Sequence, residues 1–253
     1  MGVVIGIFSP KGGVGKTLLA TNLAVAIGLG HRRKTILIDL NNGSGTADLL
    51  LDLDPDRSWF DLIPVIDELT QEHISLAVTE YRPGLDILAS PPGMVLTEVF
   101  TKDYLSILLD TMRNEYDLVV LDTPSGNDIA ARESLGLVDI RLLLLTPDIP
   151  ALRSISRLLT GLPDKEIVTG LVINQHSPGA AINPDEIKSR LGAPLFGVLP
   201  MDPDGVWSNI SYGEPCVLRK SSKLGRSIRN LSACLLRIID QRVIQETNDD
   251  QGG

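Results

Sequence analysis

The sequence GIFSPKGGVGKT occupies residues 6–17 and joins two segments with different apolar patterns. The continuous apolar run Val3–Phe8 leads into it and predicts a buried β-strand. The residues that follow, Lys16–Leu29, carry apolar side chains at helical spacing and predict an α-helix. A glycine-rich loop between a strand and a helix is the setting of a phosphate-binding loop. The pattern therefore predicts a nucleotide site where the loop enters the helix.

The loop has the residue types that a bound triphosphate requires. Its glycines lack a Cβ atom, so the backbone can wrap closely around phosphate oxygens, and the helix N-terminus adds partial positive charge. Lys16 is expected to neutralise the β- and γ-phosphates, and the Thr17 hydroxyl is expected to bind Mg²⁺. The predicted contacts to the nucleotide are Gly12, Gly13, Val14, Gly15, Lys16, Thr17 and Leu18.

One position departs from the ordinary phosphate loop, Gly-x-x-x-x-Gly-Lys-Thr. Where that motif has its first glycine, this chain has Pro10, followed by Lys11. In this respect the segment Lys11–Thr17 resembles the deviant phosphate loop (deviant Walker A) of the ParA/MinD family. The resemblance implies an ATPase that binds ATP with Mg²⁺. It also implies that Lys11 is a signature lysine that reaches across a dimer interface to the partner's nucleotide.

Strands and helices alternate along the rest of the chain. Most of the predicted strands are continuous apolar runs, which are typical of a parallel sheet covered on both faces. They are Thr35–Leu40, Leu85–Ala89, Leu118–Asp122, Arg141–Thr146, Gly170–Asn174 and Pro194–Leu199. The predicted helices are Trp59–Leu69, Ile74–Glu80, Lys102–Asn114, Asp128–Leu137, Ala151–Gly161, Pro184–Leu191 and Ser222–Gln245. The alternation predicts an α/β fold with three layers, in which helices cover both faces of a mostly parallel, doubly wound sheet.

Length and composition favour a single domain over residues 1–245, which the resemblance implies is a P-loop ATPase domain, with a polar, disordered tail over residues 246–253. A chain of 253 residues is near the upper limit for one hydrophobic core. Cys216 and Cys234 are too few for a disulfide framework and favour a reducing cytoplasm. The net charge of −9 argues against a whole surface that binds nucleic acid.

Two predicted strands end in carboxylates that would lie near the loop. Asp39 could reach Mg²⁺ or orient the attacking water. Four apolar residues precede Asp122, the pattern of a Walker B carboxylate that holds the Mg²⁺ shell beside Thr17. The ParA/MinD family usually carries Asp-x-Asp at the first of these positions, and here Asn41 replaces the second aspartate. Because an amide cannot accept a proton from water, the departure predicts slow hydrolysis with nucleotide binding intact.

The last predicted strands supply candidate contacts to the base. The resemblance implies that Asn174 hydrogen-bonds adenine, since its amide offers a donor and an acceptor together. The segment Leu199–Pro203 resembles the loop that covers the base from the other side, through Pro200, Met201 and Asp202. The alternatives are a turn-capping amide at Asn174 and an ordinary proline turn in the later segment.

Within the family, the sequence most resembles the CpaE/TadZ branch, whose members place pilus or secretion machinery. The similarity lies in loose patterns at Leu49–Pro55, Ala89–Gly93 and Thr146–Arg153. MinD proteins end in a basic, apolar helix that binds membrane, but here acidic and polar residues follow the amphipathic segment Leu231–Ile244. We therefore expect this segment to pack on the core and do not expect membrane binding.

A basic cluster lies before that segment and consists of Arg219, Lys220, Lys223, Arg226 and Arg229. By resemblance to ParA proteins it could bind DNA non-specifically, and as a run of charges it could equally be a solvated face. No base-reading element accompanies it. We expect a cytoplasmic protein, with recruitment to a cell pole, the nucleoid or the inner membrane surface left open.

The leading hypothesis is an ATP-dependent homodimerisation switch with slow ATPase activity that positions a pilus or secretion apparatus, a division site or DNA. Lys11, Lys16 and Asp39 would be catalytic, and Thr17, Asp39 and Asp122 would serve the metal. A protein partner or cargo would bind the surface that the switch segments form. One alternative is a scaffold that scarcely hydrolyses ATP, because of Asn41. A biosynthetic ligase of the same superfamily is disfavoured, since no segment suggests a substrate pocket.

Overall fold

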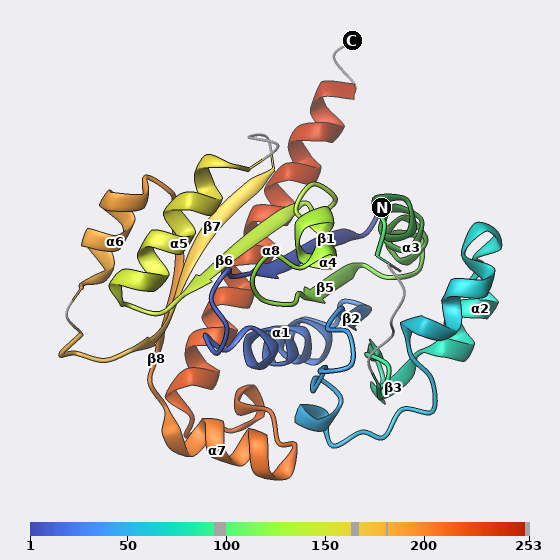
Figure 1. Cartoon of the computed structure of the whole chain (residues 1–253), viewed down its shortest axis with the longest axis horizontal. Helices are drawn as coiled ribbons and strands as arrows, with labels where there is room; N and C mark the ends of the chain where they lie inside the picture. Colours follow the sequence, from blue (N-terminus) through green and yellow to red (C-terminus); the bar gives the residue numbers. More distant parts are fainter. Residues whose placement is uncertain (94–99, 163–166, 181, 251–253) are drawn as a thin grey trace.

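Eight strands form one sheet in the order β3-β4-β2-β5-β1-β6-β7-β8, with β1 inside it (Figure 1). The computed structural model describes residues 1–93, 100–162, 167–180 and 182–250, with side chains up to residue 241. The strands are β1 (Val3–Phe8), β2 (Thr35–Asp39), β3 (Thr79–Arg82), β4 (Leu85–Leu88), β5 (Leu118–Asp122), β6 (Ile140–Leu145), β7 (Val168–His176) and β8 (Leu195–Pro200). Neighbouring strands are parallel except β3 and β4, which pair antiparallel at one edge. The predicted fold class is confirmed.

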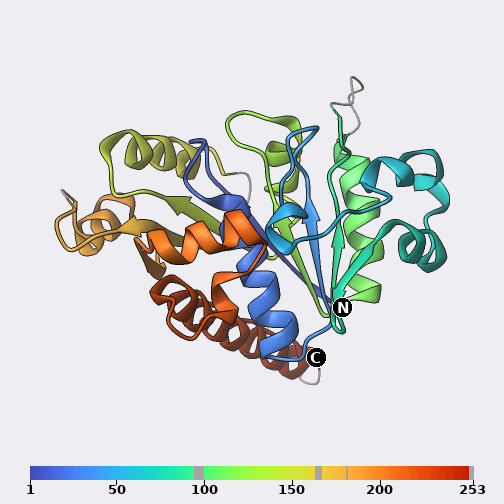
Figure 2. The ribbon, with the colours of Figure 1, turned by 90° about the horizontal axis from the view of Figure 1, so that it is seen from below.

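Helices cover both faces of this sheet. They are α1 (Lys16–Val25), α2 (Gln71–Ala77), α3 (Lys102–Glu115), α4 (Ile129–Ser134), α5 (Ile149–Thr160), α6 (Pro184–Leu191), α7 (Pro203–Tyr212) and α8 (Lys223–Asp250). Shorter helical segments are η1 (Ala26–Gly30), η2 (Leu49–Leu51), η3 (Trp59–Glu68) and η4 (Cys216–Leu218). Figure 2 shows α1 and α8 on one side of the sheet and α5 on the other.

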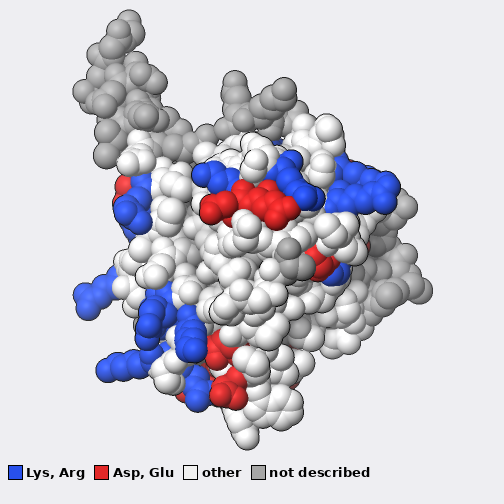
Figure 3. Space-filling model, turned by 90° about the vertical axis from the view of Figure 1, so that its left-hand side faces the viewer, with Lys and Arg blue, Asp and Glu red and all other residues white. Residues whose placement is uncertain are grey.

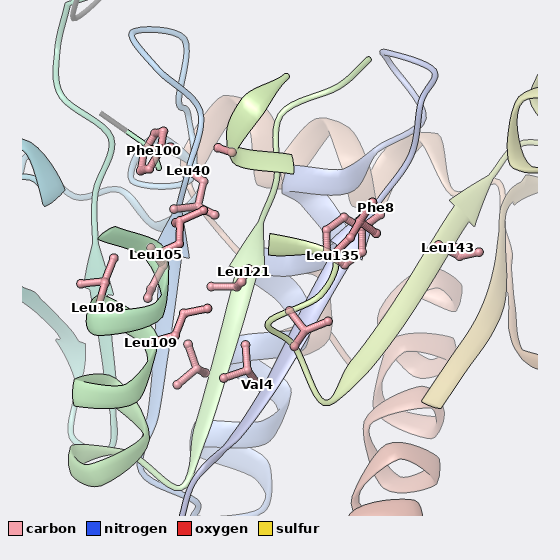
Figure 4. Packing of buried hydrophobic residues seen from close by; sticks show 14 of the residues in the cluster. Val4, Phe8, Leu40, Phe100, Leu105, Leu108, Leu109, Leu121, Leu135 and Leu143 are labelled. Atoms are coloured by element: carbon pink, nitrogen blue, oxygen red, sulfur yellow. The ribbon is translucent and has the colours of Figure 1, made fainter. Parts of the chain in front are cut away.

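Each face of the sheet carries its own aliphatic core. Along β5, Val119 and Leu121 belong to one core, and Leu118 and Val120 belong to the other, because successive residues of a strand face opposite sides. Figure 4 shows Leu109 of α3 near Leu121 in the first of these cores. Burial on both faces explains why the strands read as continuous apolar runs.

The segment between β2 and β4 differs most from the prediction. Trp59–Glu68 forms a 3₁₀ helix with Pro64 inside it, and proline lacks the N–H group that an α-helix would need there. The helix predicted over Ile74–Glu80 is wrong at both ends, because α2 spans Gln71–Ala77 and β3 follows it. Half-buried and exposed residues alternate along β3, so no apolar run marked it as a strand.

One helix near the C-terminus was not predicted. α7 follows β8 directly, and its large apolar residues Trp207 and Ile210 are exposed. An apolar stripe that faces the core is the signal for an amphipathic helix, and the inward side of α7 instead carries Gly205, Ser208 and Asn209. Residues 203–212 therefore show no apolar periodicity that predicts a helix.

The C-terminal helix is longer than predicted. α8 continues to Asp250, so residues 246–250, which we expected in a disordered tail, are helical; residues 251–253 lie outside the described part of the chain. Leu231 and Leu235 of α8 are buried in the core beside α1, as expected for its amphipathic segment. Within the described ranges, no helix is both long and apolar enough to cross a bilayer.

Candidate functional site

The loop between β1 and α1 has a backbone that only glycine adopts readily. Gly13 and Gly15 have φ angles of 73° and 93°, in the left-handed region that disfavours residues with a Cβ atom. A Cβ atom added at Gly15 would lie 2.6 Å from Nδ2 of Asn174. The glycine therefore permits both the turn of the loop and the close approach of β7.

The first turn of α1 differs from that of other helices. Gly15 is its N-cap, and no side chain hydrogen-bonds to the cap. Among the described residues, six other α-helices have a side-chain cap, formed by Thr70, Thr101, Asp128, Asp148, Asn183 and Asp202, and Ser58 caps the 3₁₀ helix η3. The N–H groups at the start of α1 are thus left for a ligand, and the helix dipole favours an anion there.

Lys16 lies beside these N–H groups and is almost fully buried. Its ammonium group donates a hydrogen bond to the Ser125 hydroxyl in the loop after β5. Burial lowers the pKa of Lys16, and the negative charge of Asp122 opposes this effect. A buried ammonium group next to an uncapped helix provides a strong site for phosphate. The sequence did not single out Ser125 as a partner of Lys16.

Asp39 and Asp122 meet at the ends of β2 and β5. They are direct partners in the parallel register, and both are buried. The Thr17 hydroxyl donates to Oδ2 of Asp122 at 2.7 Å. Oδ1 of Asp122 is buried and has no hydrogen-bond partner within the described residues. Burial, and then the charge of Asp39, raise the pKa of Asp122 to about 8; burial also raises the pKa of Asp39.

These groups fit a magnesium ion that arrives with a nucleotide. The Thr17 hydroxyl and the Asp122 carboxylate that it contacts are suitable ligands, and Mg²⁺ in proteins usually combines one or two carboxylates with phosphates and water. In keeping with this, no group of three His, Cys, Asp or Glu side chains that could hold a metal occurs among the residues described. The phosphates would supply the remaining ligands.

Asn41 bridges the two buried carboxylates. Its Nδ2 donates to Oδ1 of Asp39 at 2.7 Å and to Oδ2 of Asp122 at 2.8 Å, and its backbone N–H donates to the same Asp39 oxygen at 3.0 Å. The other oxygen of Asp39 accepts from the backbone N–H groups of Thr46 and Ala47. The loop after β2 is therefore folded around the Asp39 carboxylate.

Lys11 contacts its own chain. Its Nζ lies 2.8 Å from Oδ2 of Asp148, an ion pair in which both side chains are more than one-third exposed, and 3.4 Å from Oγ1 of Thr146. Asp148 also caps α5 by accepting from the Ala151 N–H at 2.9 Å. The sequence marked Asp148 only as a residue after a strand, since no spacing rule connects it to Lys11.

A cavity of about 380 Å³ lies beside the loop at the ends of β7 and β8. Its apolar lining includes Leu18, Val206 and Ile210. The four predicted base contacts, Asn174, Pro200, Met201 and Asp202, also line it. Nδ2 of Asn174 donates to the Val14 carbonyl at 2.8 Å. The apolar wall from α7 was not predicted, because that helix was missed.

Asp202 also borders this cavity, but its carboxylate is engaged elsewhere. Oδ2 accepts from the Ser222 hydroxyl at 2.7 Å and from the Leu224 N–H at 3.0 Å, and Oδ1 accepts from the Gly205 N–H at 3.2 Å. The side chain thus joins the start of α7 to the start of α8. A structural role accounts for these contacts.

The basic cluster lies at the start of α8 and just before it. Lys220, Lys223 and Arg226 are exposed, whereas Arg219 lies 3.9 Å from Glu214 and Arg229 donates to the Val217 carbonyl. Figure 3 shows Lys and Arg side chains at the lower left and at the upper right of one face of the molecule, with acidic side chains beside both groups. The cluster is therefore partly neutralised.

A family profile matches most of the chain. The family described as CobQ/CobB/MinD/ParA nucleotide binding domain covers residues 5–215. A putative septum site-determining protein MinD from Guillardia theta is 30% identical over 243 residues, which is 93% of this chain and 88% of the relative.

Two solved structures have the same fold. The septum site-determining protein MinD from Pyrococcus horikoshii, complexed with Mg-ADP, superposes with a TM-score of 0.76 at 22% identity, over 92% of this chain and 95% of the other. MinD in the MinC:MinD cell division protein complex from Aquifex aeolicus gives a TM-score of 0.79 at 24% identity, over 92% and 95%. At these identities the likeness shows the fold alone.

Proposed function

We propose that this chain, which belongs to the CobQ/CobB/MinD/ParA nucleotide-binding family, is a slow ATPase that acts as an ATP-dependent dimerisation switch and positions a cellular cargo. The observation that carries the proposal is the meeting of an uncapped helix, the buried Lys16 and the Thr17–Asp122 pair at one loop. Together they match the charge and ligand needs of a Mg²⁺-bound triphosphate.

Each side chain has a role in this proposal. Lys16 and the N–H groups of the loop bind the phosphates, and Thr17 with Asp122 holds the metal. Bound Mg²⁺ neutralises charge on the phosphates. Asp39 lies beside Asp122 and orients the attacking water. Asn174 binds adenine, while Pro200 and Met201 cover it.

Lys11 connects nucleotide binding to dimerisation. In the monomer it is paired with Asp148, and an exposed ion pair of this kind contributes only about 0–1 kcal/mol. A triphosphate on a second subunit offers Lys11 more negative charge than one carboxylate does. We propose that Lys11 leaves Asp148 to reach the partner's nucleotide, so that dimers form only with ATP.

The proposal also covers the cellular cargo and the branch of the family to which the chain belongs. The patterns at Leu49–Pro55 and Thr146–Arg153 favour the CpaE/TadZ branch and hence a pilus or secretion apparatus, whereas the curated relative from Guillardia theta carries the MinD name. We propose a cytoplasmic protein whose partner binds the surface formed by the loops after β2 and β5. Non-specific DNA binding through Lys220, Lys223 and Arg226 is a weaker candidate, since acidic groups lie nearby.

Sedimentation velocity tests the switch. The parent protein should be a monomer with Mg²⁺-ADP and a dimer with Mg²⁺ and a non-hydrolysable ATP analogue. Lys11→Ala should bind the analogue, measured by calorimetry, yet remain a monomer. A parent that stays monomeric with both nucleotides would refute the switch.

A second candidate is a scaffold that binds ATP but scarcely hydrolyses it. Asn41 favours it, because an amide between the carboxylates cannot accept a proton. Turnover of Asn41→Asp beside the parent decides between them. A large gain in rate supports the scaffold, and an unchanged rate leaves the slow ATPase.

A further inference from the structure

Asn41 makes contacts that the proposed reaction does not require. Its amide N–H₂ group spans carboxylates on two different strands, at 2.7 Å from Asp39 and 2.8 Å from Asp122. The backbone of Asn41 is held separately, because the Ser90 hydroxyl donates to its carbonyl. The side chain thus has two partners, both buried acids, and can leave one of them while the backbone stays in place.

We infer that Asn41 is a clamp that holds Asp39 and Asp122 together in the absence of a divalent cation and releases Asp122 when a cation binds. This inference rests on the metal site of the proposed function. Neighbouring parallel strands lie about 4.8 Å apart, so two carboxylates in register repel each other strongly when they are buried. The amide has two N–H donors, one for each carboxylate. An aspartate at this position has no donor and would add a third negative group.

The clamp and a cation bound to Thr17 compete for the Asp122 oxygen on the Thr17 side. The other oxygen, Oδ1, has no hydrogen-bond partner within the described residues but is fully buried. Oδ2 of Asp122 already accepts from both Thr17 and Asn41. A carboxylate oxygen with two donors is poorly available to a metal until one donor leaves. Thr17 belongs to the rigid start of α1, whereas Asn41 lies in a loop. Asn41 is therefore the donor that moves, which makes it a positioning residue for the metal.

The release should be detectable at Trp59. Its indole N–H donates to the backbone carbonyl of Asp39 at 2.9 Å, and the side chain is fully buried. Movement of the loop around Asp39 changes the surroundings of this hydrogen bond. The other tryptophan, Trp207, is 68% exposed on α7, so Trp207→Phe leaves Trp59 as the only emitter.

The experiment compares Asn41→Ala, Asn41→Asp and the parent, all with Trp207→Phe and with ADP bound, because phosphates supply the metal ligands that the chain lacks. Asn230→Ala, an exposed asparagine on α8, is the matched control. Free Mn²⁺ is measured by electron paramagnetic resonance during titration. We expect Mn²⁺ to bind roughly 10-fold more tightly to Asn41→Ala than to the parent, because a competing hydrogen bond to a charged group is gone. Asn41→Asp should bind still more tightly, and Asn230→Ala should match the parent.

Trp59 emission during Mg²⁺ titration provides the second readout. The parent should show a change that saturates, and Asn41→Ala should already have the Mg²⁺-bound spectrum before titration. Equal or weaker Mn²⁺ binding by both Asn41 variants would overturn the clamp. Circular dichroism identifies a variant that fails to fold, and Asn41→Ser then replaces it. Neither readout uses ATP, so the clamp and the dimerisation switch can fail separately.

Discussion

The two ends of the candidate site are built in different ways. At the phosphate end, polar side chains from β2, β5 and α1 are buried and hold one another. At the base end, the wall of the cavity is largely apolar and includes Met201 and Ile210, which are 53% and 60% exposed. Hydrogen bonds between buried charged groups are strong and directional, whereas contacts with a partly exposed apolar wall each contribute little binding free energy. The comparison predicts unequal effects of substitution at the two ends.

Lys16→Ala should have the largest effect. It removes the buried ammonium group, and a hydrogen bond to a charged group contributes about 1.5–3 kcal/mol, so with the lost Coulomb attraction we expect affinity to fall roughly 100-fold. Calorimetry with Mg²⁺-ATP and with inorganic triphosphate should show the same loss, because only phosphate contacts are removed. Lys188→Ala, on the exposed side of α6, is the control. A loss confined to ATP would contradict the assignment of this end.

Gly15→Ala should have the next largest effect. Alanine at this position would have to adopt a φ of 93°, and a left-handed conformation costs about 1–2 kcal/mol in residues other than glycine. Its Cβ atom would also lie 2.6 Å from Nδ2 of Asn174. We expect roughly a 10-fold loss of Mg²⁺-ATP affinity and a lower melting temperature. Gly30→Ala, where a Cβ atom would meet nothing within 4 Å, should melt like the parent. Equal melting of both variants would show that the loop is more adaptable than the φ angles indicate.

Asp148→Asn tests Lys11, whose ammonium group at the phosphate end is partly exposed. The change frees Lys11 from its ion pair but preserves the size of the side chain. Because such pairs contribute about 0–1 kcal/mol, the dimer with ATP analogue should tighten by no more than about 5-fold, as measured by sedimentation equilibrium. Combined with Lys11→Ala, the substitution should have no further effect on dimerisation. A weaker dimer for Asp148→Asn alone would show that the pair supports the dimer.

Met201→Ala should have the smallest effect. The side chain is already half exposed, so truncation removes only about 0.6 kcal/mol of apolar contact with the base. We expect about a 3-fold loss of affinity for ATP and none for inorganic triphosphate, in the same calorimetric assay. Any loss for triphosphate would mean that the two ends are not independent.

The same contrast separates what the sequence predicts from what it does not. The phosphate loop and the strand ends at Asp39 and Asp122 follow from local patterns, because glycine conformation, apolar runs and a terminal carboxylate are all local properties. Partners such as Ser125 and Asp148 are brought to the lysines only by the order of the strands. Nothing in the sequence near either residue marks that pairing.

The base end shows the limit of periodicity as a signal. α7 turns its polar side inward and its tryptophan outward, so the rule that helices bury an apolar stripe misses it. Asp202 was predicted to contact the base because its segment resembles the family's base-covering loop, and that contact stays a prediction, whereas its carboxylate bonds to the starts of two helices. Its hydrogen bonds to Ser222 and Leu224 join segments that lie apart in the sequence, so no local pattern predicts them.

The antiparallel strand β3 has a consequence for how copies of this protein can associate. It lies at one edge of the sheet, carries charged and half-buried residues, and has an irregular register between Glu80 and Arg82. Irregular, charged edges resist the addition of a further strand. This border should therefore not extend into a continuous sheet from one molecule to the next, which disfavours fibre growth from that side even at high protein concentration.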